Sequence, residues 1–287
     1  MKAAGYAELY IDPLERCLAY LATYADDHSW PPIDQITTGH LEEYLVYFRA
    51  RPLWFGDRAR GQGRTPSITY VDSQRRRLLR FFGWLLSRGH VDTNPMELVR
   101  RTPPEKKVVP TVPESSVGDL LRLTDPSVAR TPGEVFRAYR DRALIYLLWD
   151  TPARRAELAG LRVGDVDLDS AVVVVTGKGR RERPMPLGSA ACEVIWEYLR
   201  ERGKVAPGHR EELWVDQSGG GLSRPAWLYQ LIKRLGLAAG IPNLYTHRFR
   251  HSYAMNALRG GMPMPVLEWT GGWSRIPETY LRTLGMD

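Results

Sequence analysis

Cationic, imidazole and phenolic side chains in the second half of the chain form a set suited to attack on a phosphodiester. The set is Arg154, Lys178, His247, Arg250, His251 and Tyr280. Arginine suits phosphate because its planar guanidinium donates two hydrogen bonds to the oxygens and stays charged. These residue types predict a phosphoryl-transfer site that needs neither a metal nor another cofactor.

Three of these residues, His247, Arg250 and His251, are spaced i, i+3 and i+4, so on a helix they share one face. Two histidines four residues apart can bind zinc. Against zinc, the residue after His247 is Arg248 rather than glutamate, and Arg250 adds a second cation between the two imidazoles. We therefore expect no metal, and we expect His247 and Arg250 to flank a phosphate.

The segment from Thr151 begins a helix in which Glu157 follows Arg154 by three residues. Such a pair is either an ordinary surface ion pair, which contributes little, or a carboxylate that holds Arg154 toward phosphate. Lys178 lies in a Gly-Lys-Gly turn, which by itself is weak evidence because many hairpins carry this pattern. A lysine on a hairpin could nevertheless donate a proton to a leaving oxygen.

Tyr280 is the candidate nucleophile. A free phenol, with a pKa of about 10, is protonated and a poor nucleophile at neutral pH. It needs a cationic pocket and a base to attack. Most single tyrosines serve packing, so the candidacy of Tyr280 depends on the other members of the set.

The whole chain is basic, with a formal net charge of +7 over 287 residues and a pI near 9.5. This balance favours a polyanionic partner such as double-stranded DNA, although it also fits a basic protein with no such partner. Two cysteines, Cys17 and Cys192, make no disulfide framework. Without a signal peptide or a membrane-length apolar run, the expected location is the cytoplasm.

The first hundred residues read as helices with caps expected at Asp34 and Thr38. A basic helix spans residues 73–86, with an apolar face that we expect to contain Leu78, Leu79, Phe82, Leu85 and Leu86. Its other face carries Arg75, Arg76, Arg77 and Arg80. These arginines are either a solvated surface or a phosphate-contacting one.

Proline density predicts an extended basic linker over residues 103–113, which carries Lys106 and Lys107. The expected organisation is a helical DNA-binding domain at 1–102 and a catalytic domain at 114–287. In the second domain we expect short strands within 165–176, with a turn at Asp169–Ser170, and another strand over 181–186. Helices should resume at Ser189. The predicted fold class is mainly α with a small antiparallel β-sheet.

The ordered motifs resemble those of the tyrosine recombinases, or phage-type integrases, over nearly the whole chain. The segment 73–99 is similar to the end of that family's helical core-binding domain, and 151–165 to its first arginine box. Gly177-Lys178-Gly179 with 183–187 is similar to its lysine hairpin, and 246–254 to its second box. One box is modest evidence, whereas four in the right order are strong evidence.

This resemblance implies a mechanism for DNA strand exchange. Tyr280 would form a 3′-phosphotyrosyl link, and Lys178 would protonate the leaving oxygen. His247 would assist proton transfer at the tyrosine. Arg154 and Arg250 would stabilise the phosphate, on which Trp273 would pack or bond. Strand exchange in the family uses four protomers, so the resemblance also implies a tetramer on DNA.

The chain departs from the family pattern at two places. Pro152 replaces the glycine of the first box, and Tyr280 follows Trp273 by seven residues where the family usually has nine. The short spacing keeps open a recombinase-derived DNA-binding protein that no longer cuts. A nicking-closing enzyme like the type IB topoisomerases, with similar chemistry but no exchange, is the other alternative.

Overall fold

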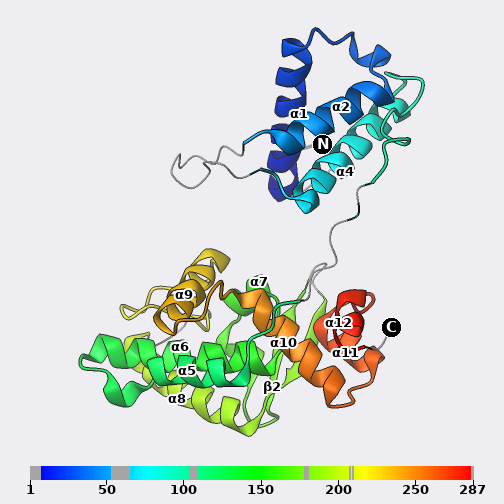
Figure 1. The fold of residues 1–287 in the computed structure, drawn as a ribbon. Helices are drawn as coiled ribbons and strands as arrows, with labels where there is room; N and C mark the ends of the chain where they lie inside the picture. Colours follow the sequence, from blue (N-terminus) through cyan, green and yellow to red (C-terminus); the bar gives the residue numbers. More distant parts are fainter. Residues whose placement is uncertain are drawn as a thin grey trace. The chain divides into compact units, whose positions relative to one another are not determined.

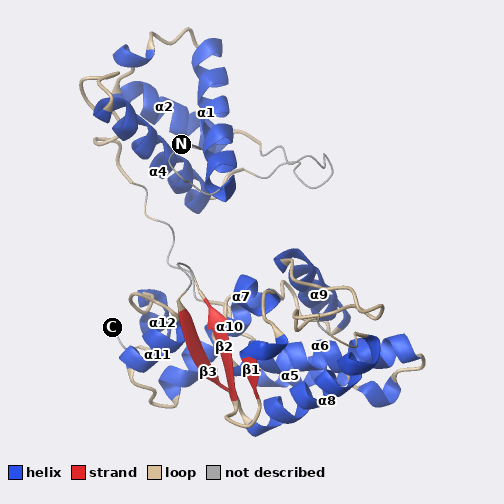
Figure 2. Ribbon diagram, turned by 180° about the vertical axis from the view of Figure 1, so that it is seen from behind, coloured by secondary structure: helices blue, strands red, loops and turns tan. Residues whose placement is uncertain are grey.

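The computed structural model describes residues 8–52, 65–101, 103, 109–177, 181–206, 208 and 210–285. The chain divides into two compact units, residues 1–106 and 107–287. Figures 1 and 2 show the two units.

Among its described residues the first unit contains the helices α1 (Glu8–Asp27), α2 (Thr38–Ala50) and α4 (Ile68–Ser87). Their apolar faces meet in one core, as the helical spacing predicts. The fully buried members of this core include Cys17, Leu41, Tyr44, Phe48, Leu78, Phe82 and Met96.

Two details of this unit differ from the sequence prediction. The cap of α2 is Thr37, not Asp34 or Thr38; its hydroxyl accepts from the backbone N–H of His40, whose ring accepts from the Thr37 N–H. Thr38 instead donates to the carbonyl of Pro95. Leu86 is exposed rather than part of the apolar face of α4, because it lies one position beyond the stripe that Leu78, Phe82 and Leu85 form.

The second unit packs around the long helix α6 (Pro132–Asp150), which is capped by Thr131 with Glu134 and buries most of its residues from Ala143 to Leu148. The helices of this unit are α5 (Glu114–Leu123), α6 (Pro132–Asp150), α7 (Arg155–Ala159), α8 (Ser189–Val205), α9 (Pro225–Ala238), α10 (Thr246–Arg259), α11 (Met264–Gly271) and α12 (Glu278–Thr283). Short 3-10 turns lie at Ile33–Gln35, Pro126–Val128 and Val163–Asp165.

A small sheet completes the second unit, with β1 (Val166–Asp167), β2 (Val172–Thr176) and β3 (Glu182–Pro186) antiparallel in that order. The predicted strands, turn and fold class are confirmed. In Figure 2 the sheet runs beside α10, and β3 lies next to α11. Inward positions alternate along β3, so Arg183 and Met185 are both buried.

The end of the predicted linker is anchored on α10. The Val112 N–H donates to the Ser252 hydroxyl over 2.7 Å, and Arg248 donates to the Thr111 carbonyl over 2.6 Å. Val109 packs against the apolar cluster that contains Tyr280. Residues 109–112 are thus part of the second unit's packing rather than a free linker. Lys106 and Lys107 lie outside the described residues.

Candidate active site

Arg154 and Arg250 come from distant parts of the sequence and meet at two consecutive peptide carbonyls. Arg154 donates to the carbonyl of Gly272 over 2.6 Å, and Arg250 donates to that of Gly271 over 2.8 Å. Arg250 also donates to the carbonyl of Pro152. Two guanidiniums therefore face one small region next to the end of α11. This convergence is what a shared phosphate pocket requires.

The two arginines differ in how far they reach water. Arg154 is the residue before α7, and 42% of its side chain is exposed. Arg250 is on α10 and is buried. Burial, together with the charge of Arg154, lowers the pKa of Arg250 to about 10. Arg250 therefore remains cationic at neutral pH, and Arg154 is the guanidinium open to an incoming anion.

Glu157 holds Arg154 through both of its carboxylate oxygens. Oε1 accepts from Nη1 of Arg154 over 2.8 Å, and Oε2 accepts from the Arg154 backbone N–H over 2.7 Å. Oε2 also accepts from Nη2 of Arg183 over 2.6 Å. Burial acts to raise the pKa of Glu157, but the hydrogen bonds from Arg183 and Arg154 outweigh it and keep the pKa below its usual value. Glu157 is therefore a buried carboxylate, and its bond to the half-exposed Arg154 is more than a surface ion pair.

Two glycines allow this close packing. Gly272 has φ +62°, and a Cβ there would lie 3.1 Å from Nη1 of Arg183 and 3.2 Å from Nη1 of Arg154. Gly271 lies directly under the Trp273 ring, where a Cβ would overlap the ring carbons. The Gly-Gly-Trp segment thus brings backbone carbonyls and an aromatic ring onto the guanidiniums.

Tyr280 lies in this site despite its short spacing from Trp273. Its residue is only 2% exposed, and its hydroxyl lies 2.6 Å from Nδ1 of His251. The Tyr280 ring also meets the Trp273 ring edge to face. The Trp273 ring in turn lies over the Arg250 guanidinium, 3.8 Å from ring centroid to Cζ. The seven-residue spacing therefore brings the phenol beside the cationic pocket.

His251, not His247, makes the hydrogen bond to the phenol. The two imidazoles meet edge to face at 4.4 Å between centroids. Burial, together with the charges of His247 and Arg250, lowers the pKa of His251 to about 4. Burial raises the pKa of Tyr280 to about 12, against the opposing effect of Arg250. At neutral pH His251 is a neutral base beside a protonated phenol.

His247 is the second histidine of the site, and its ring contacts that of His251. Burial and the charges of Arg250 and Arg154 lower its pKa, so it too is an uncharged imidazole near the two arginines at neutral pH. Within the part of the chain that the structure describes, no three His, Cys, Asp or Glu side chains gather into a possible metal site.

Lys178 lies outside the described residues, but both sides of its hairpin are described. The Gly177 N–H donates to the Arg181 carbonyl over 2.8 Å. A Cβ at position 177 would lie 2.8 Å from Nη1 of Arg183 and 3.5 Å from Oε1 of Glu157. The lysine turn therefore begins directly beside the Arg154–Glu157 pair.

Arg183 is the residue that sequence reasoning missed, although it falls within the lysine-hairpin motif. Its signal was present, because strand alternation puts it on the same inward face as Met185. A buried arginine on a strand must have a carboxylate or carbonyl partner. Here the partners are Glu157 and the Thr270 carbonyl.

Comparison with known proteins agrees with this geometry. Residues 128–282 match the phage integrase family. The chain belongs to this family, the tyrosine recombinases. The tyrosine recombinase XerD of Corynebacterium glutamicum is 32% identical over 255 residues, covering 88% of this chain and 79% of that protein. XerC of Xanthomonas axonopodis pv. citri is 30% identical over 204 residues, which cover 71% of this chain and 63% of that protein.

Solved structures of tyrosine recombinases share the fold. The XerH site-specific recombinase, in a post-cleavage complex with a palindromic difH substrate, matches with a TM-score of 0.75 at 19% identity. That match covers 96% of this chain and 76% of XerH. The Tn1549 transposon integrase bound to transposon right-end DNA matches with a TM-score of 0.71 at 17% identity, covering 98% and 91%.

In this tyrosine recombinase, some of the α4 arginines that are predicted to contact DNA form ion pairs within the protein. Arg75 and Arg76 both pair with the buried carboxylate of Asp72, at 3.2 and 3.5 Å, and Arg101 joins them at 3.6 Å. The Arg75 side chain is 16% exposed, whereas that of Arg76 is 60% exposed. Arg76 is thus the better placed of the two to reach a phosphate.

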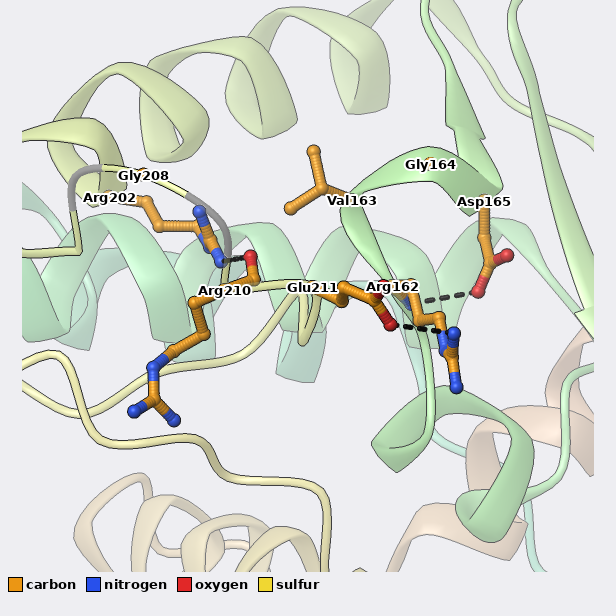
Figure 3. A pocket seen from close by; sticks show the side chains of 8 residues that line it. All are labelled: Arg162, Val163, Gly164, Asp165, Arg202, Gly208, Arg210 and Glu211. Atoms are coloured by element: carbon orange, nitrogen blue, oxygen red, sulfur yellow. Dashed lines mark hydrogen bonds and ion pairs between the residues drawn. The ribbon is translucent and has the colours of Figure 1, made fainter.

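A separate open pocket of about 640 Å³ is lined by the Val163–Asp165 turn and by residues that include Gly208, Arg210 and Glu211. Figure 3 shows Arg162 and Arg202 bonded to neighbouring groups of the pocket. Arg162 pairs with Glu211 at 2.7 Å, and the buried Arg202 donates to backbone carbonyls, including that of Arg210. The predicted site residues are not part of its lining. None of the described helices is long and apolar enough to cross a membrane.

Proposed function

We propose that this tyrosine recombinase cleaves and rejoins double-stranded DNA at specific sites through a 3′-phosphotyrosyl intermediate. The observation that carries the proposal is the 2.6 Å contact between the Tyr280 hydroxyl and Nδ1 of His251, beside the paired guanidiniums of Arg154 and Arg250. This arrangement supports a site in which Tyr280 is the nucleophile, His251 the base, and the two arginines the phosphate-binding cations.

In the cleavage step, the Tyr280 oxygen attacks the scissile phosphorus and the bond to the 5′-oxygen breaks. His251 takes the phenolic proton on Nδ1, and Lys178 gives a proton to the departing 5′-oxygen. Arg154 and Arg250 stabilise the charge on the nonbridging oxygens. The phosphotyrosyl bond conserves the energy of the broken ester, so the 5′-hydroxyl of a partner strand can reverse the step without a nucleotide or a metal.

The contacts in the free protein describe a resting arrangement. With a Tyr280 pKa near 12 and a His251 pKa near 4, the proton stays on the phenol. The donors of Arg250 are bonded to backbone carbonyls and its face is covered by Trp273. Binding of the scissile phosphate must therefore compete for the guanidinium donors and draw the phenol out of its 2% exposed position. The local positive charge would then favour the phenolate.

The two units would divide the work. We propose that residues 1–102 form a DNA-binding domain and that 114–287 form the catalytic domain. Residues Arg75, Arg76, Arg77 and Arg80 are the proposed phosphate contacts in the first domain, and Lys106 and Lys107 those of the linker. Phosphate contacts would supply most of the affinity and a steep salt dependence. Base contacts would choose the site, and four protomers on DNA would exchange strands.

The test is covalent capture on nicked duplexes that release a short fragment after cleavage, so that religation is prevented. Because the target sequence is unknown, the duplexes carry randomised arms and the captured DNA is sequenced. We expect a denaturation-resistant protein–DNA band that is enriched in one sequence class. Tyr280→Phe should abolish the band. Tyr253→Phe changes a partly buried tyrosine packed in the same apolar cluster, and it should leave the band intact.

Each other outcome contradicts the proposal in a definite way. A band that persists in Tyr280→Phe removes Tyr280 as the nucleophile. No band with the intact protein favours a recombinase-derived DNA-binding protein. Relaxation of a supercoiled plasmid that lacks every captured sequence favours a topoisomerase-like nicking-closing activity.

A further inference from the structure

We infer that Arg183 is a positioning residue for DNA cleavage, acting on the phosphate-binding arginines without touching DNA itself. This inference rests on the proposed function. Arg183 lies on β3, opposite Val175 of β2, with its side chain directed into the unit and 9% exposed. Three observations support the assignment: its bonds to Glu157 and to Thr270, and its place beside the lysine turn.

The first link runs to Arg154 through Glu157. Nη2 of Arg183 donates to Oε2 of Glu157 over 2.6 Å, and the same oxygen accepts from the Arg154 backbone N–H over 2.7 Å. The other oxygen, Oε1 of Glu157, accepts from Nη1 of Arg154. One carboxylate is thus fixed from both sides by guanidiniums. Without Arg183 the carboxylate loses the contact that sets its orientation, and Arg154 loses its fixed position.

The second link runs to the carbonyls that meet both arginines. Nε of Arg183 donates to the carbonyl of Thr270 over 3.0 Å. Thr270 directly precedes Gly271 and Gly272, whose carbonyls accept from Arg250 and Arg154. Arg183 therefore fixes the same turn of α11 on which the two phosphate-binding side chains rest.

The third link concerns the lysine turn. Nη1 of Arg183 lies close to Gly177 on one side and to Gly272 on the other, since a Cβ at either position would approach it to 2.8 and 3.1 Å. The guanidinium fills the space between the start of the Lys178 turn and the end of α11. It therefore connects three segments of the site that are far apart in sequence.

Burial decides between direct contact and positioning. The Arg183 side chain is 9% exposed and its Nε and Nη2 are engaged within the protein, whereas that of Arg154 is 42% exposed. A phosphate could reach Arg183 only after these bonds break. Its effect on cleavage must therefore pass through Arg154, Arg250 and the hairpin.

The test measures single-turnover formation of the covalent complex and, separately, DNA affinity. We expect Arg183→Met to slow cleavage by about 100-fold, the size expected for a small misplacement of catalytic groups. DNA affinity should change by no more than about twofold, since Arg183 makes no phosphate contact. Arg183→Lys keeps the charge but cannot bond to Glu157 and the Thr270 carbonyl in the same fork geometry. It should fold normally and show an intermediate loss.

A double-mutant cycle separates positioning from general stability. Because Arg183 acts in part through Arg154, adding Arg183→Met to Arg154→Ala should slow cleavage by far less than 100-fold. The matched control is Arg202→Met, another buried arginine of this unit whose donors go to backbone carbonyls. Its variant should leave the cleavage rate of the folded protein unchanged, alone or with Arg154→Ala.

Wild-type cleavage rates in both Arg183 variants would overturn the inference, as would full additivity with Arg154→Ala. A loss of DNA affinity that accounts for the rate would make Arg183 a binding residue instead. Failure of the wild-type protein to form any covalent complex would refute the proposed function, and the inference with it. The wild-type arm thus distinguishes the two failures.

Discussion

Asp72 in the first unit and Glu157 in the second are both buried carboxylates with more than one arginine partner, yet they are bound very differently. The partners of Asp72 lie at 3.2 to 3.6 Å, and two of them have side chains 60% exposed. The partners of Glu157 lie at 2.6 and 2.8 Å, and the Arg183 side chain is 9% exposed. Glu157 also accepts a backbone N–H.

This difference separates two uses of arginine. Around Asp72, long side chains can leave the carboxylate for water or for a phosphate at little cost. Around Glu157, the guanidiniums are held by several short bonds to a buried carboxylate, so their positions are defined before any substrate arrives. The first arrangement suits adjustable backbone contacts, and the second suits catalysis.

The largest expected effect comes from removing each carboxylate in turn. Glu157→Ala leaves Arg183 buried without its anion, so the second unit should lose about 3 to 5 kcal/mol of unfolding free energy. Asp72→Ala removes the partner of Arg76 and Arg101, whose 60% exposed side chains can turn to water, so the first unit should lose only about 1 kcal/mol. Hydrogen–deuterium exchange across a urea series reports each unit separately. Equal losses of unfolding free energy in the two units would mean that Asp72 and Glu157 are bound equally tightly.

A smaller effect is expected at Gly272. Gly272→Ala places a methyl group against Arg154 and Arg183 at a residue with φ +62°. Gly240→Ala is the matched control, because Gly240 has φ +69° with open space around its Cβ position. Both variants should lose about 1 to 2 kcal/mol from the left-handed backbone conformation.

Only the Gly272 variant should also slow covalent-complex formation, by about tenfold, because it alone displaces the guanidiniums. Single-turnover assays on the folded proteins measure this difference. A wild-type cleavage rate in Gly272→Ala would mean that Arg154 and Arg183 can move to accommodate the methyl group. The arginines around Glu157 would then be as adjustable as those around Asp72.

Sequence reasoning succeeded where the signal is local. The strands around Asp169–Ser170 and the start of α8 at Ser189 follow from turn residues and periodicity, and the structure confirms both. The pairing of Arg154 with Glu157 follows from their spacing and is confirmed at 2.8 Å. The convergence of Arg154 and Arg250 was expected from the family resemblance, since no local rule connects residues 96 positions apart.

Other features depend on contacts that spacing cannot reveal. His247 and His251 share one face of α10, and only the packing of α12 decides which of them meets Tyr280. Predicting the role of Arg183 required both strand alternation and the knowledge that Glu157 lies within hydrogen-bonding distance of it. The docking of residues 109–112 onto Ser252 and Arg248 offers no periodic signal, so the proline density predicted only an extended linker there and not these contacts.

The smallest expected effect concerns the exposed arginine beside Asp72. If Arg76 contacts a DNA phosphate, Arg76→Ala should weaken binding to all sequences alike and reduce the slope of log affinity against log salt by about one. The cleavage rate at saturating DNA should stay unchanged, since Arg76 pairs with Asp72 in the first unit and not with the catalytic residues. Arg122→Ala is the matched control, because Arg122 is also exposed and paired with an aspartate within its own helix. A salt slope that falls equally in both variants, or in neither, would mean that α4 presents an ordinary solvated face. A fall of the salt slope in Arg76→Ala alone would instead support contact between the arginines around Asp72 and the DNA backbone. The arginines around Glu157 would then serve the scissile phosphate.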